Sequence, residues 1–208
     1  MKRGFYTIMC AQFLSSLADN ALLIAAIALL TSIQAPGWMT PLLKLFFVIS
    51  YVVLASWVGI FADLMPKGRV MFITNAVKVA GCLMMLFGSH PLLSYAIVGI
   101  GAAAYSPAKY GILTELLPPE KLVIANGWIE GLTVVSIILG VVLGGILVEP
   151  DVGAAILAFF HMPLVGLHTV AEAAIAMIVF VYAAAAAVNL AIPDTGARYS
   201  KHSFEPVA

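Results

Sequence analysis

Six long apolar runs take up most of this 208-residue chain, with polar or Gly/Pro breaks between them. A helix needs about 20 apolar residues to cross the hydrocarbon core of a bilayer, which is roughly 30 Å thick. No run has the alternating polarity of a membrane β-strand. The sequence therefore predicts an all-α, polytopic membrane protein with six transmembrane helices. The runs are Phe5 to Ile33, Pro41 to Leu64, Val70 to Gly88, Leu92 to Leu113, Leu122 to Val148 and Val170 to Ile192.

Composition supports this class and excludes others. Hydrophobic residues make up 63% of the chain, charged residues 10%, and the mean hydropathy is +1.09, too little polar surface for a soluble globule. The formal net charge is zero, so nucleic acid is not expected as a partner. The sequence contains no recognisable nucleophile, metal-ligand set or phosphate-binding loop. We therefore expect neither an enzyme nor a cofactor.

Positive charges in the short connections predict the orientation of the spans. They gather on one side of the predicted topology, at Lys2, Arg3, Lys67, Arg69, Lys121, Arg198 and Lys201, whereas the opposite connections contain no Lys or Arg. The side rich in Lys and Arg is normally cytoplasmic. We expect one six-helix bundle over residues 1–193, both termini in the cytoplasm, and a cytoplasmic linker or tail over 194–208. Within 149–169, the short apolar stretch Gly153 to Phe160 predicts a re-entrant or interfacial segment.

Several charged or polar side chains fall inside the predicted spans, where each charge is costly unless it faces a partner or a cavity. Asp19 ends a polar stripe of the first span that also contains Gln12, Ser15 and Ser16. Asn75 with Lys78, and Asn126 with Glu130, are spaced to share a helix face. Two interpretations remain open: Asp19 pairs with a lysine such as Lys78 for packing, or these groups line a cavity.

The segment from Tyr105 to Gly111 places Lys109 and Tyr110 close to Pro107. The proline removes a backbone donor and frees a carbonyl, which membrane proteins tolerate chiefly beside protein or a watery cavity. This combination predicts a ligand site. Elsewhere, Gly140 and Gly144 form a GxxxG pattern that is typical of closely packed helices.

The cytoplasmic connection after the second span contains Asp63, Lys67, Gly68 and Arg69. An acid that ends one helix and basic residues that begin the next can form a charged clamp, which would hold two helices in one state of a moving transporter. We therefore expect Asp63, Lys67 and Arg69 to act in gating.

This connection resembles the GxxxDxxGRR signature of the major facilitator superfamily, with an interval from Asp63 to Gly68 that is two residues longer. Within that superfamily the chain is similar to the amino-terminal half of the bacterial lysophospholipid transporter family. The resemblance lies in residues 11–15, 19–23, 67–71, 99–113 and 125–127. It implies half of a major facilitator superfamily transporter, with six helices in this half.

The resemblance also implies a function and a set of site residues. The family moves lysophospholipids, chiefly lysophosphatidylethanolamine, across the bacterial inner membrane by alternating access, and an acyltransferase then remakes the diacyl lipid. Cations suit the phosphate of such a lipid and carboxylates suit its ammonium group. We expect the substrate to contact Asp19, Asn20, Lys78, Tyr105, Lys109, Tyr110, Asn126 and Glu130.

Two alternatives remain open at this stage. A proton-coupled drug or metabolite exporter of the same fold would use Asp19 or Glu130 as its protonated carboxylate, whereas an inactive or structural truncated half would use the buried charges only for packing. Transporters of this superfamily have two six-helix halves. We therefore expect membrane lipid around the bundle and a second six-helix half, or another copy of this chain, beside it.

Overall fold

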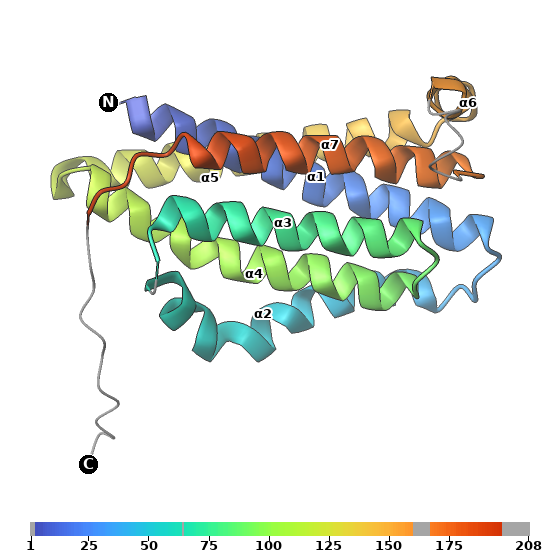
Figure 1. Cartoon of the computed structure of the whole chain (residues 1–208), viewed down its shortest axis with the longest axis horizontal. Helices are drawn as coiled ribbons and strands as arrows, with labels where there is room; N and C mark the ends of the chain where they lie inside the picture. The colour runs from blue at the N-terminus through green and yellow to red at the C-terminus, as the bar shows by residue number, and fades with distance from the viewer. Residues whose placement is uncertain (1–2, 64, 160–166, 197–208) are drawn as a thin grey trace, which may run out of the picture.

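The computed structural model describes residues 3–63, 65–159 and 167–196, and this part of the chain folds into seven helices (Figure 1). Six of the helices are long and apolar enough to cross a membrane, as the runs predict. The remaining one, α6, has ten residues. The helices are α1 (Arg3–Ser32), α2 (Met39–Asp63), α3 (Lys67–Leu86), α4 (Pro91–Leu116), α5 (Pro119–Leu147), α6 (Pro150–Phe159) and α7 (Val170–Leu190).

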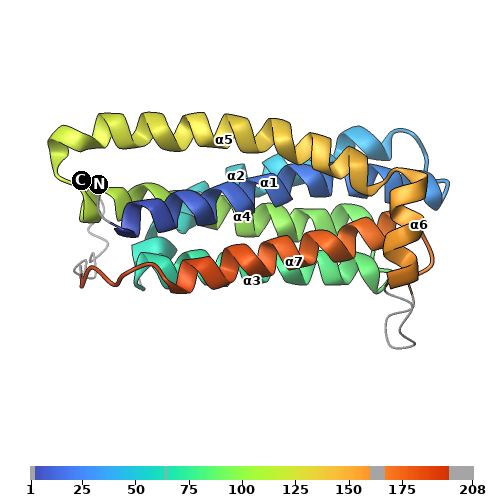
Figure 2. The same ribbon diagram turned by 90° about the horizontal axis from the view of Figure 1, so that it is seen from above.

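The six long helices form two layers of three. One layer contains α5, α1 and α7, and the other contains α2, α4 and α3, so that α1 and α4 lie at the centre (Figures 1 and 2). Along one edge of the block α3 packs on α7, which joins the layers. At the opposite edge α2 and α5 are the outermost helices, and many of their apolar side chains are exposed.

The first and last described residues lie at the same end of the bundle, together with the α2–α3 and α4–α5 connections (Figure 1). We call this the terminal end. Arg3, Lys67, Arg69 and Lys121 belong to this end, which agrees with the predicted clustering of positive charge. The side of the membrane that this end faces stays a prediction.

Prolines mark several helix starts at or near their predicted places. Pro91 and Pro119 occupy the first positions of α4 and α5, where a missing N–H costs nothing, and Pro66 precedes α3. Pro107, in contrast, lies inside α4, which continues through it to Leu116. The helix tolerates the lost backbone hydrogen bond because neighbouring helices surround this stretch, which is largely buried.

Glycines allow α5 to approach α1 closely. A Cβ atom at Gly140 would lie 2.5 Å from the Leu17 carbonyl oxygen, and one at Gly144 would lie 2.8 Å from that of Ala21. Real Cβ atoms do not approach backbone so closely, so these positions require glycine unless the helices separate. The predicted GxxxG contact is therefore present, between α5 and α1.

The predicted short segment after α5 contains α6, which runs crosswise at the end of the bundle opposite the termini (Figures 1 and 2). Gly153 packs directly on α7, where its Cβ would lie 2.0 Å from Val170 Cγ1. A capping box of Thr169 and Glu172 begins α7. Residues 160–166 lie outside the described part of the chain, as do residues 197–208 of the expected tail.

Candidate functional site

A buried ion pair joins α1 to α3 near the middle of the bundle. The Lys78 ammonium lies 2.8 and 2.9 Å from the two carboxylate oxygens of Asp19 and also donates to the Ser15 hydroxyl at 2.9 Å. The side chain of Lys78 is 1% exposed and that of Asp19 is 19% exposed. The Ser15 hydroxyl in turn donates to Asn75 Oδ1 at 2.8 Å. The packing interpretation of Asp19, with Lys78 as its partner, therefore matches the geometry.

Helix α7 contributes a tyrosine that contacts this ion pair, and the sequence did not predict that contact. The Tyr182 hydroxyl donates to Asp19 Oδ1 at 2.7 Å, and its ring centre lies 5.5 Å from the Lys78 ammonium. The Tyr105 ring of α4 lies 5.2 Å from the same ammonium. Two aromatic faces thus stabilise the cation beside its carboxylate.

Gly101 explains how a lysine fits between α3 and α4. A Cβ at Gly101 would lie 2.6 Å from the Thr74 carbonyl oxygen and 2.7 Å from Lys78 Cγ. The absence of a side chain there leaves room for the stem of Lys78, which therefore runs between the helices toward Asp19.

A second charged cluster connects α4 to α5. The Lys109 ammonium lies 3.8 Å from Glu130 Oε1 and 4.3 Å from the ring centre of Tyr110. The Tyr110 hydroxyl donates to the same Glu130 oxygen at 2.5 Å. Lys109 is nearly buried, whereas the Glu130 side chain is 55% exposed. This cluster is looser and more open than the pair of Lys78 and Asp19.

The two predicted asparagines differ in their surroundings. Asn20 donates to the Ser16 carbonyl of its own helix at 2.8 Å and lies against Gly140 of α5. Asn126 is exposed on α5, one turn before Glu130. The structure therefore divides the eight expected residues into the Asp19 pair with Tyr105, the Lys109 cluster, and two asparagines at the edges of these groups.

The expected clamp is partly assembled at the terminal end. Lys67 donates to the Asp63 carboxylate and to the Ala62 carbonyl oxygen, so it joins the end of α2 to the start of α3. Arg69 is exposed and, like Lys67, lines a pocket of about 310 Å³ between α3, α4 and the end of α7. Two residues along a helix correspond to about 200° of rotation, so the two side chains leave α3 in different directions.

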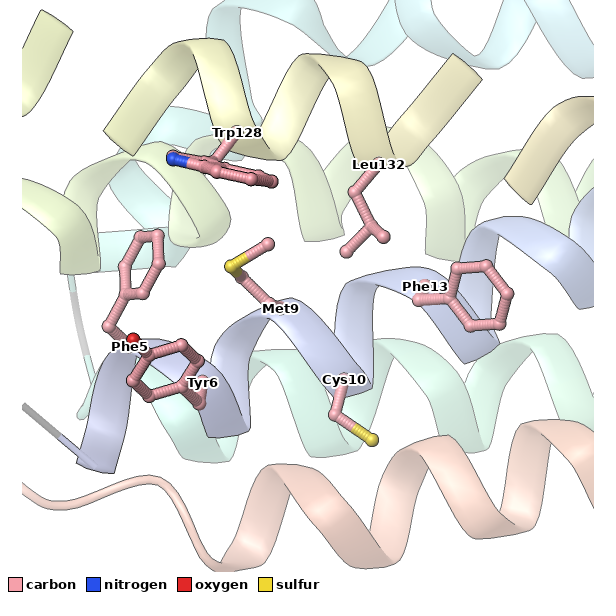
Figure 3. Close-up of a pocket in the computed structure, with 7 residues that line it drawn as sticks. All are labelled: Phe5, Tyr6, Met9, Cys10, Phe13, Trp128 and Leu132. Atoms are coloured by element: carbon pink, nitrogen blue, oxygen red, sulfur yellow. The ribbon is translucent and has the colours of Figure 1, made fainter. Parts of the chain in front are cut away.

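An apolar groove separates α1 from α5 in the half of the bundle near the terminal end (Figure 3). Its volume is about 560 Å³, and its lining is almost entirely carbon and sulfur. The groove contains none of the charged residues above. Its lining residues are Phe5, Tyr6, Met9, Cys10, Phe13, Trp128 and Leu132.

Both charged clusters present groups of opposite charge and a tyrosine side by side. Each cluster combines an ammonium, a carboxylate and at least one tyrosine. Among the described residues, no three His, Cys, Asp or Glu side chains group as a metal site requires.

Comparison with known proteins agrees with this architecture. The family model of the Major Facilitator Superfamily matches residues 8–194. The chain belongs to the major facilitator superfamily. Within it, the chain is 43% identical over 208 residues to the "Lysophospholipid transporter LplT" of Yersinia enterocolitica and 45% identical to that of Serratia proteamaculans. These matches cover 100% of this chain and 47% and 48% of the relatives. The chain thus spans about half the length of the curated relatives it matches.

Proposed function

We propose that this superfamily member forms the six-helix half of a transporter that moves lysophospholipids across the bacterial inner membrane by alternating access. The names of the similar proteins support the substrate class. The clustered positive charge at the terminal end supports a cytoplasmic location of both termini. A second six-helix half, or another copy, would complete the pathway, and an acyltransferase would consume the delivered lipid.

The observation that carries this proposal is the loose pair of Lys109 and Glu130. Their 3.8 Å separation and the exposure of Glu130 leave both groups open to a new partner, unlike the 2.8 Å contact of Lys78 with Asp19. A zwitterionic head group carries a phosphate for Lys109 and an ammonium for Glu130. Binding of the head group would therefore replace one ion pair with two.

The buried pair has a different place in the same cycle. Asp19 and Lys78 tie α1 to α3, and Tyr182 ties both to α7, so these helices move together while the pair is closed. The Asp19 side chain is partly exposed. It could therefore contact the head group in another state of the transporter. Asn20 and Asn126 would add neutral hydrogen bonds along the path, and the contact of Asp63 with Lys67 would limit the rocking.

Uptake of labelled lysophosphatidylethanolamine into membrane vesicles tests the proposal. The vesicles contain this chain, its Lys109→Ala variant or the full-length Yersinia enterocolitica relative as a positive control. We expect lysine-dependent uptake by this chain, either alone or after fusion to the remaining half of that relative. Active uptake by the relative, with none by this chain in either form, would contradict the proposed function.

A further inference from the structure

The groove between α1 and α5 lies where a lipid chain of one leaflet would run. Helices α1 and α5 are close at Gly140 and Gly144 and separate toward the terminal end (Figure 2). The hydrogen bond from Gln12 to Thr133, at 3.1 Å, joins them at the inner end of the groove, next to Phe13 and Leu132. Because Phe5 and Phe13 are eight residues apart on α1, the groove follows that helix for about 12 Å. It therefore lies within the leaflet at the terminal end.

The groove is apolar along its length and carries polar groups toward its outer end. Met9 and Phe13 of α1 face Trp128 and Leu132 of α5 across it (Figure 3). Phe5 is buried and lines the groove, with its ring edge-to-face against Tyr6 at 5.7 Å. The exposed rings of Tyr6 and Trp128 suit the boundary between head groups and acyl chains.

A cation lies on the same side of α5 as the groove. Lys121 is exposed in the first turn of α5, and it precedes Trp128 by seven residues and Leu132 by eleven. These spacings place the three side chains on one helix face, with Lys121 about 10 Å nearer to the membrane surface than Trp128. A positive charge beyond an apolar groove complements a lipid that carries a phosphate and one acyl chain.

We propose that this groove binds the acyl chain of a lysophospholipid in the leaflet at the terminal end, with the lipid phosphate at Lys121. This inference rests on the proposed function and adds a site for the substrate tail outside the charged clusters. Lysolipid in this site would lie beside the transporter on the side of the membrane where the termini lie. The lipid would bind there before it enters the transport pathway or after it leaves that pathway.

The native tryptophans supply the reporter for a binding test. Two double variants each keep one of the three tryptophans. The variant with Trp38→Phe and Trp57→Phe keeps Trp128 as its fluorophore. The variant with Trp38→Phe and Trp128→Phe keeps Trp57. Trp57 is a matched control because it is 68% exposed on α2, compared with 60% for Trp128 on α5, and does not line the groove. Both proteins are placed in phosphatidylcholine vesicles, to which lysophosphatidylethanolamine with a brominated chain is added. Circular dichroism and gel filtration verify that each variant is folded.

We expect saturable quenching of Trp128 at a few mole per cent of lysolipid, at least twofold greater than the quenching of Trp57. Lys121→Ala should raise the half-saturating amount several-fold, and Lys121→Arg should restore it. Equal, non-saturating quenching of both tryptophans would overturn the site. Equal quenching by a brominated diacyl lipid at the same bromine content would also overturn it, because the groove would then hold an ordinary membrane lipid. An unchanged half-saturating amount in Lys121→Ala would overturn the assignment of the phosphate to Lys121.

The two proposals fail in different ways. Saturable quenching of Trp128 without any lipid uptake would leave the groove site intact and count against the transport function. Uptake without selective quenching would overturn the groove site and leave the transport function intact.

Discussion

Tyr182 donates a hydrogen bond to Asp19 from a helix that begins more than 150 positions later in the chain. The bond brings α7 to a carboxylate that already joins α1 to α3. Three of the six spans therefore meet at one acid. Because the hydroxyl binds a charged acceptor in a buried place, we expect it to contribute more than an ordinary neutral hydrogen bond.

Tyr182→Phe should lower the free energy of unfolding by about 1.5–3 kcal/mol, the usual cost of losing a hydrogen bond to a charged group. Tyr105→Phe is the matched control, because its ring also contacts Lys78 but no hydrogen bond from its buried hydroxyl to a carboxylate is found among the described residues. It should cost clearly less than Tyr182→Phe. Unfolding of the purified protein in mixed micelles by added SDS gives both values. Equal losses in the two variants would count against a special role of Tyr182.

The pair of Asp19 and Lys78 should show strong coupling. Lys78→Met leaves a partly buried carboxylate without its cation, and Asp19→Asn leaves a buried ammonium, so each change should cost about 3–5 kcal/mol. The double variant removes both charges and should recover most of that loss. The same SDS titration applied to all four proteins measures the coupling. Additive losses would show that the two charges are stabilised independently.

Packing of α5 on α1 can be tested at two adjacent glycines. Gly144→Val would force a side chain into the backbone of Ala21, whereas a Cβ at Gly145 meets nothing within 4 Å. We expect Gly144→Val to lower the free energy of unfolding by about 1–3 kcal/mol, the usual range for overpacking. Gly145→Val should lower it by about 0.5 kcal/mol or less. Thermal unfolding in detergent provides the comparison. A similar loss at both positions would indicate a general effect of valine in this helix.

Much of the fold could be predicted because a bilayer imposes a length and a composition on each span. The six runs match the six long helices, with ends that differ by a few residues where prolines set the start. The placement of α6 could not be predicted, since its direction depends on the contact of Gly153 with Val170. A mostly apolar segment of ten residues is too short to span a bilayer, but its sequence does not specify the direction in which it runs.

The site could be predicted less completely, because a rare charge inside a span is conspicuous and a tyrosine is not. Asp19, Lys78, Lys109 and Glu130 stood out from the sequence, and the pairing of Asp19 with Lys78 was one of the two interpretations. Tyr182 did not stand out, since its role depends on which face of α7 meets α1. The pattern Ala183 to Ala187 after it gives no such information.

Substitution of Lys109 should affect transport much more than stability. Lys109 pairs with a carboxylate that is largely exposed, and such pairs contribute about 0–1 kcal/mol, so Lys109→Ala should leave the unfolding midpoint nearly unchanged. The same change should lower lysophosphatidylethanolamine uptake at least tenfold, because the lipid phosphate loses its cation. Lys44→Ala, at an exposed position near the start of α2, is the control for loss of a lysine and should affect neither quantity. If uptake fell in proportion to stability in Lys109→Ala and Lys78→Met alike, the Lys109 cluster would be a packing feature, and the head group would have to bind elsewhere.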